Sequence, residues 1–96
     1  MVSVLRTRRV GRIESYAFPP PLVSKLTERD PAVSHSCAEA AVEELREWFV
    51  ARAEHTHLPP PTGLADVAWR EFILMTKKYR EFCERGFGGY VHYPPG

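Results

Sequence analysis

Two runs of three prolines, at residues 19–21 and 59–61, most constrain what this chain can fold into. Each run stiffens the backbone into polyproline geometry and separates the segments that are able to form helices. A chain of 96 residues is too short for two independent cores. We therefore expect one domain over residues 1–96, with its helices on either side of these runs.

The segment at the end of the first proline run predicts a short helix over residues 20–29. Leu22 and Leu26 lie four residues apart, which places them on one helical face. Asp30 ends this helix, because the residue before Pro31 is pushed out of the helical region.

Residues 36–55 predict a long helix. It begins at Ser36, which forms a capping box with Glu39: the serine hydroxyl accepts a hydrogen bond from the glutamate amide, and the glutamate reaches back. Its apolar residues recur at steps of three and four, as on one face of a helix. They are Ala38, Ala41, Val42, Leu45, Trp48, Phe49 and Ala53.

Residues 62–85 carry the strongest apolar stripe, with Thr62 as the N-cap and Gly86 as a left-handed C-cap. The stripe consists of Ala65, Ala68, Trp69, Phe72, Ile73, Thr76, Tyr79, Phe82 and Cys83. The three patterns together predict an all-α fold, a small bundle of two long helices (36–55 and 62–85) and the short helix 20–29.

The segment 87–93 contains large side chains between glycines, and such a segment seldom stays free in water. We expect Phe87, Tyr90 and Tyr93 to fold back on the last helix, because their burial removes apolar surface from water. The receiving face carries Trp69, Phe72, Ile73 and Tyr79, and Gly86, Gly88 and Gly89 permit the reversals.

Cysteine content and hydropathy point to a cytoplasmic protein outside the membrane. Cys37 and Cys83 are too few for a disulfide framework, and no secretory apolar stretch follows the first residue. The longest apolar run, residues 72–75, is far shorter than a membrane span. We expect free thiols, a cytoplasmic location and no membrane partner.

Residues 1–18 show no helical stripe, and we expect a flexible or extended arm there. The arm carries Arg6, Arg8, Arg9 and Arg12 and, over residues 1–12, no acid. The chain has 13 bases and 12 acids in total, so its remainder is mildly acidic. The arm can meet phosphates, which makes nucleic-acid association the alternative to a merely solvated terminus.

A set of aromatic, cysteine and glycine residues near the C-terminus resembles an uncharacterised bacterial family described as glycine-rich-domain-containing-protein-like. The matching residues are the run 66–74, then Thr76, Tyr79, Phe82, Cys83, Phe87, Gly88, His92, Tyr93 and Pro94. The resemblance spans residues 58–95, and a looser likeness extends upstream. It implies a relative in fold and brings no established activity, substrate or cofactor.

This chain departs from the family pattern at two histidine positions. Arg70 follows Trp69 where relatives have histidine, and Tyr93 replaces the second of two closing histidines. Guanidinium is not a usual metal ligand, so a histidine-rich metal site built from these positions is not expected here.

The remaining histidines and cysteines give weak signals for a metal or a nucleophile. His55 and His57 lie two residues apart, but their spacing to Cys83 and His92 matches no zinc motif. Cys83 lies on the apolar stripe, where a cysteine usually behaves as a small hydrophobe. We expect no cofactor, no metal and no catalytic residues.

The leading hypothesis is a small non-catalytic helical module that binds an unknown protein partner or forms a homo-oligomer, because its aromatic residues exceed what two short helices bury easily. The alternatives are nucleic-acid association through the arginine arm, and a metal-binding or enzymatic domain. Under the leading hypothesis the candidate binding residues are Trp69, Arg70, Tyr79, Tyr90, His92 and Tyr93.

Overall fold

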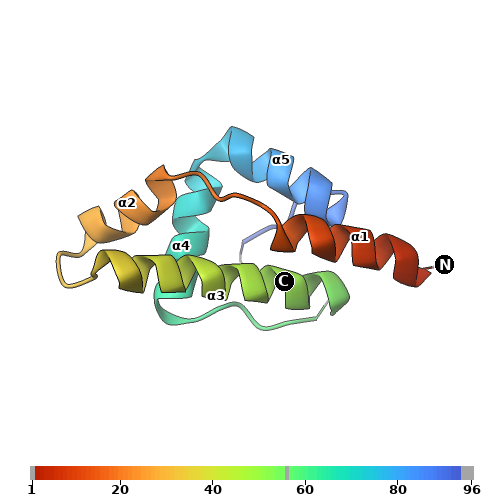
Figure 1. Ribbon diagram of the computed structural model, residues 1–96, viewed down its shortest axis with the longest axis horizontal. Coiled ribbons are helices and arrows are strands. Elements are labelled where there is room, and N and C mark those ends of the chain that lie inside the picture. The colour runs from red at the N-terminus through yellow and green to blue at the C-terminus, as the bar shows by residue number, and fades with distance from the viewer. Residues whose placement is uncertain (1, 56, 94–96) are drawn as a thin grey trace.

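The backbone of residues 2–55 and 57–93, and the side chains of residues 8–55 and 57–93, are described by a computed structural model. These residues form five helices and no strand, which confirms the all-α class (Figure 1). The helices are α1 (Val2–Glu14), α2 (Pro21–Arg29), α3 (His35–Glu54), α4 (Gly63–Leu74) and α5 (Thr76–Phe87).

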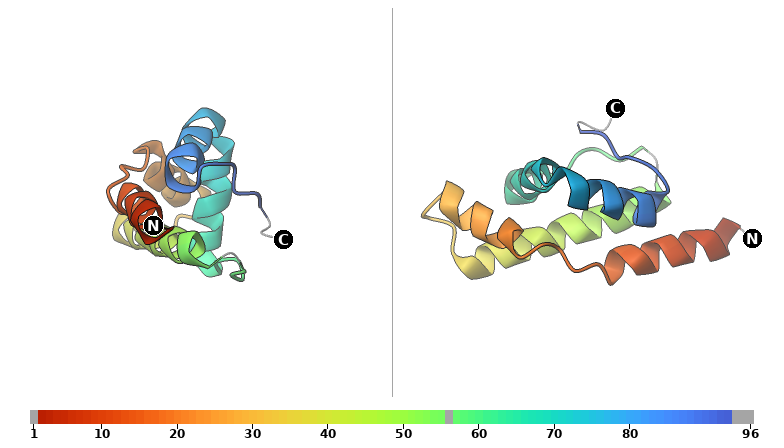
Figure 2. Two further views of the ribbon diagram at one scale, coloured as in Figure 1. Left: turned by 90° about the vertical axis from the view of Figure 1, so that its right-hand side faces the viewer. Right: turned by 90° about the horizontal axis from the view of Figure 1, so that it is seen from above.

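Helix α3 is the longest element, and α1, α2 and α4 all pack against it. Seen from above in Figure 2, α1 and α2 follow one another along the length of α3. Helix α5 packs on α1 and α4 and lies opposite α3, with Phe82 and Phe87 of α5 in contact with Phe49 of α3 (Figure 1). The molecule is elongated, with extents of 47 × 23 × 21 Å.

The short helix is found where the sequence predicts it. Leu22 and Leu26 are fully buried, and Asp30 leaves the helical region with φ −143° and ψ 109°. The apolar stripe of α3 is also confirmed, with Ala38, Ala41, Val42, Leu45 and Phe49 buried.

The predicted capping box at Ser36 is wrong, because the N-cap is Ser34, two residues earlier, and α3 begins at His35. Ser34 has extended backbone angles, and its hydroxyl accepts a hydrogen bond of 3.1 Å from the amide of Cys37. An N-cap must leave the helical region while its side chain turns back to the third amide, and Ser34 meets both conditions. Ser36 lies within the first turn instead.

The predicted extended arm is wrong for Val2–Glu14, which forms helix α1. The helix is stabilised by tertiary contacts: Ile13 is fully buried, and a guanidinium nitrogen of Arg46 reaches the end of α1 from α3. That nitrogen donates to the carbonyls of Ile13 (2.8 Å), Glu14 (3.0 Å) and Tyr16 (2.6 Å). Because these contacts come from α3, no local pattern in residues 1–18 predicts them.

The predicted long helix over residues 62–85 is wrong in one respect, because it is interrupted at Met75. This residue has φ −86° and ψ 64°, and it separates α4 from α5. Thr62 precedes α4 as its N-cap, although its side chain caps no amide. A straight helix would hold Trp69 and Tyr79 roughly 15 Å apart along its axis, whereas the bend brings their side chains to hydrogen-bonding distance.

The left-handed C-cap is Gly88, with φ +71°, and the prediction of Gly86 for this role is wrong. Gly86 lies inside α5 against α1. A Cβ atom at this position would lie 2.9 Å from Cγ1 of Ile13, so the glycine permits close approach of the two helices.

Large aromatic side chains dominate the core between the helices. Trp69, Tyr79, Phe49 and Phe72 are fully buried, and Phe82 nearly so. None of the described helices is both long and apolar enough to cross a membrane.

Candidate functional site

The segment after α5 crosses α5 and α4, and a buried chain of hydrogen bonds anchors it. The hydroxyl of Tyr79 donates to the carbonyl of Val91 at 2.5 Å, and the indole nitrogen of Trp69 donates to that hydroxyl at 3.0 Å. Val91 itself is buried. The tail is therefore fixed by one aliphatic side chain and one backbone carbonyl.

The aromatic residues of the tail pack on the helical face that the sequence predicts, but they are only partly covered. The ring of Tyr90 meets Tyr79 edge-on at 5.2 Å between centroids, and Tyr93 meets Trp69 in the same way at 4.9 Å. Tyr90 remains 45% exposed and Tyr93 38% exposed, so their burial is not the main anchor. The prediction is wrong for Phe87, which is the last residue of α5 and packs against Phe49 of α3 at 5.9 Å between ring centroids.

Burial and one carboxylate shift the pKa values of three titratable groups near the tail. Burial raises the pKa of the Tyr79 hydroxyl and of the Cys83 thiol. The interaction with the Asp66 carboxylate raises the pKa of Tyr93, and the same carboxylate pairs with Arg70 at 3.2 Å. Cys83 is thus held as a neutral thiol, which is a poor nucleophile.

The six candidate binding residues lie on the side of the molecule where the tail packs. Two of them are buried and four are exposed. Trp69 and Tyr79 are buried beneath the tail. The other four, Arg70, Tyr90, His92 and Tyr93, are exposed to solvent.

The weak metal candidates are distributed differently. His55, His57 and His92 are exposed, whereas Cys83 is buried. Among the residues that the structure describes, no three histidine, cysteine or acidic side chains are placed to hold a metal ion.

The arginines of the proposed nucleic-acid arm lie in different surroundings. Arg8 is exposed, Arg9 is half-buried beside Gly88, and Arg12 donates to the carbonyl of Arg85 at 3.2 Å. The side chain of Arg6 lies outside the described residues.

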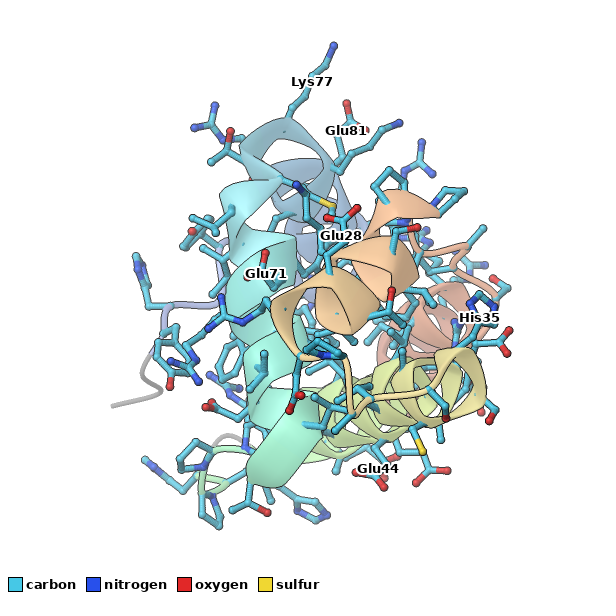
Figure 3. The ribbon with its side chains drawn as sticks, turned by 90° about the vertical axis from the view of Figure 1, so that its left-hand side faces the viewer. Glu28, His35, Glu44, Glu71, Lys77 and Glu81 are labelled. Atoms are coloured by element: carbon cyan, nitrogen blue, oxygen red, sulfur yellow. The ribbon has the colours of Figure 1, made fainter. Side chains whose placement is uncertain are left out.

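A groove of about 770 Å³ lies elsewhere, between the connection from α1 to α2 and the outer side of α5. Its walls are residues 16–21 on one side and Lys78, Glu81 and Arg85 of α5 on the other, with Lys25 and Met75 at one end. Figure 1 shows the connection passing close to the start of α5, and Figure 3 shows Glu81 on the surface of α5.

Aromatic side chains of α4 and α5 hold the apolar wall of the groove in place. Tyr16 meets Phe82 at 4.8 Å between ring centroids, and Phe18 meets Phe72 at 5.2 Å. The guanidinium of Arg46 lies 4.9 Å from the centre of the Phe18 ring. Two aromatic residues beside a proline run were visible in the sequence, but their proximity to α5 follows only from the tertiary packing.

In its described residues, the molecule belongs to the class of small all-helical proteins, with an anchored aromatic tail and a surface groove. A family model described as UCP032817-like matches residues 8–96, and the chain belongs to that family. No curated protein and no solved structure matches the chain. The family is uncharacterised and assigns no activity, and the likeness to glycine-rich-domain-containing proteins stays a prediction.

Proposed function

We propose that this chain is a non-catalytic helical module whose groove beside α5 binds an acidic, partly apolar segment of a partner protein. The observation that carries the proposal is the groove itself, at about 770 Å³. Small-molecule sites usually have volumes of roughly 300–1,000 Å³, so a groove of this size has room for side chains of a docked segment. Tyr16 and Phe18 provide apolar surface, and tyrosine is among the residues that contribute most at interfaces.

The charges around the groove support an acidic partner. Lys25, Lys78 and Arg85 line it against one acid among the described lining residues, Glu81, and Lys25 also pairs with Glu28 at 3.8 Å. Glu44 of α3 lies far from Lys77 of α5 in Figure 3, and Glu43 of α3 is paired with Arg46 at 2.9 Å. Positive charge around an apolar floor favours a segment that carries the opposite charge.

Rigidity of the groove also supports binding. The wall contains three consecutive prolines, and its aromatic residues are fixed by packing on Phe72 and Phe82. A surface that is already ordered loses little conformational entropy when a partner docks.

The tail face is a second candidate for the same function. Tyr90 and Tyr93 are 45% and 38% exposed although the backbone beneath them is anchored. Partly exposed aromatic residues on a fixed backbone are suited to protein contacts.

Matched variants of the full chain distinguish the two surfaces. Ala17→Trp fills the groove, and Ala40→Trp adds the same side chain to the exposed surface of α3. Lys78→Glu reverses a charge of the groove, and Lys77→Glu reverses its exposed neighbour outside it. Proteins retained from a native extract by each tagged variant are quantified by mass spectrometry, and melting temperatures confirm folding.

We expect Ala17→Trp and Lys78→Glu to lose a partner that the Ala40→Trp and Lys77→Glu chains retain. Equal retention by all four variants would refute the groove as the binding site. If only a Tyr90→Ser, Tyr93→Ser double variant lost the partner, the tail face would be the binding site. Light scattering on the purified chain tests whether the partner is a second copy.

A further inference from the structure

We infer that Arg9 and Arg52 form a binding site for the phosphate group of a small molecule, at the point where the tail leaves α5. The two arginines come from α1 and α3, and they line one pocket of about 280 Å³. Phe87, Gly89 and Tyr90 line its other side. None of its described lining residues belongs to the groove of the proposed function, so the two sites are separate.

Arg52 provides the first argument, because part of its guanidinium is buried without a partner. In the described structure, its Nε atom is inaccessible to solvent and makes no hydrogen bond. A buried polar group without a partner destabilises a protein, so a ligand that offered an acceptor oxygen to this guanidinium would be bound favourably. A guanidinium binds phosphate oxygens through two parallel hydrogen bonds, and the Nε–H of Arg52 becomes available for one of them when the side chain turns toward the pocket that it lines.

Arg9 provides the second argument, because the backbone of the tail makes room for its guanidinium. A Cβ atom at Gly88 would lie 2.8 Å from the Nη2 atom of Arg9. The glycine therefore has two roles: it adopts φ +71° to end α5, and it lets the guanidinium lie against the backbone.

The charge of the pocket is not balanced by the described side chains. None of their carboxylates lies within ion-pairing distance of Arg9 or Arg52. The C-terminus of α5 supplies about half a negative charge, and Arg12 already contacts its carbonyl at Arg85. Two partly buried cations therefore retain a net positive charge, which favours a dianion such as phosphate.

The size and walls of the pocket indicate which phosphate compounds fit. A volume of about 280 Å³ is close to the lower end of small-molecule sites and too small for a length of nucleic acid. Phe87 and Tyr90 offer aromatic surface beside the two arginines. These walls suit a phosphate ester with a small apolar group.

Nuclear magnetic resonance of the ¹⁵N-labelled full chain tests the site. The Nε–H signal of Arg52 and the amide signals of Gly89 and Tyr90 are followed during titration with inorganic phosphate and, separately, with phenyl phosphate. Sodium chloride at matched ionic strength is the control for screening. The variants are Arg9→Gln and Arg52→Gln, with Arg80→Gln as an exposed arginine outside the pocket.

We expect saturable shifts with phosphate, and an affinity at least about tenfold lower in Arg9→Gln and Arg52→Gln, since each loses a charge-assisted hydrogen bond. The Arg80→Gln variant should bind as the parent chain does. Tighter binding of phenyl phosphate would identify an aromatic ester as the better ligand, and equal binding would identify the phosphate group alone. If Arg52→Gln fails to fold, the phosphate affinity of Arg9→Gln alone tests the site.

The proposal is overturned if phosphate produces no shifts beyond those of chloride, or if both arginine variants bind as tightly as the parent chain. Neither result affects the groove, because the variants that test it lie outside this pocket.

Discussion

Arg46 joins three segments that lie apart in the sequence. Its guanidinium donates to three carbonyls at the end of α1, pairs with Glu43 at 2.9 Å and covers the ring of Phe18. One side chain therefore caps α1 and fixes the wall of the groove.

Replacement of this arginine tests its role. We expect Arg46→Met to lower the free energy of unfolding by about 1.5–3 kcal/mol or more, because hydrogen bonds to a charged donor are lost and carbonyls are left unpaired. Arg80→Met, at an exposed position on α5, should change it by less than about 0.5 kcal/mol. Urea denaturation measures both values, and equal effects would contradict the capping role.

Tyr79 gives the molecule a predictable response to alkaline pH. Its pKa is raised above the ordinary value of 10.0 by burial. Above pH 10 the unfolded chain therefore loses a proton that the folded chain retains, and the free energy of unfolding falls as pH rises.

The Tyr79→Phe variant isolates this effect. At neutral pH it should be less stable by about 1–3 kcal/mol for each buried group left unpaired, namely the indole of Trp69 and the carbonyl of Val91. The difference from the parent chain should narrow above pH 10, because phenylalanine has no proton to lose. Denaturation curves between about pH 8 and 11 measure this difference in the free energy of unfolding. A difference that stays constant over this range would contradict the raised pKa of Tyr79.

At the scale of the elements, the contact of α1 with α5 depends on a glycine. Gly86 lies in α5 with Ile13 of α1 against it, whereas Gly11 lies in α1 with open space around it. Both glycines are helical, so their replacement separates packing from helix propensity.

We expect opposite effects from the same substitution at these two positions. Gly86→Ala should lower stability by about 1–3 kcal/mol, because the new methyl group displaces the fully buried Ile13. Gly11→Ala should raise it by about 0.5–1 kcal/mol through its better helix propensity. Thermal melts of the two variants measure both changes in stability. A stabilising Gly86→Ala would show that α1 is not closely packed on α5.

The whole molecule is held together by one set of buried side chains that extends from Ile13 in α1 to Val91 in the tail. Every helix contributes to it, including α1 and the segment after α5. The tail is consequently expected to unfold together with the helices rather than ahead of them.

Two neighbouring residues of the tail test this cooperativity. Val91→Ser should lower the free energy of unfolding by about 1.5–3 kcal/mol, because Val91 is buried. Tyr90→Ser, at a position that is 45% exposed, should have the smaller effect. Circular dichroism and tryptophan fluorescence should report one shared transition in each variant, and separate transitions would show that the tail is an independent unit.

The sequence by itself determined the helical class, the short helix α2, the apolar face of α3 and the face on which the tail packs. These features follow from local spacing, because residues three and four apart share a helical face whatever surrounds them. Leu22 with Leu26 and the stripe from Ala38 to Phe49 are buried for this reason.

Only the tertiary structure decided the helical state of α1, the bend at Met75, the groove beside α5 and the placement of Arg9 and Arg52 at one pocket. Each depends on residues far apart in the chain: Arg46 caps α1 from α3, and the bend brings Tyr79 under both Trp69 and Val91. No proline or glycine marks the bend at Met75. Local patterns carry no information on contacts between distant segments, and in this chain those contacts create both proposed binding sites.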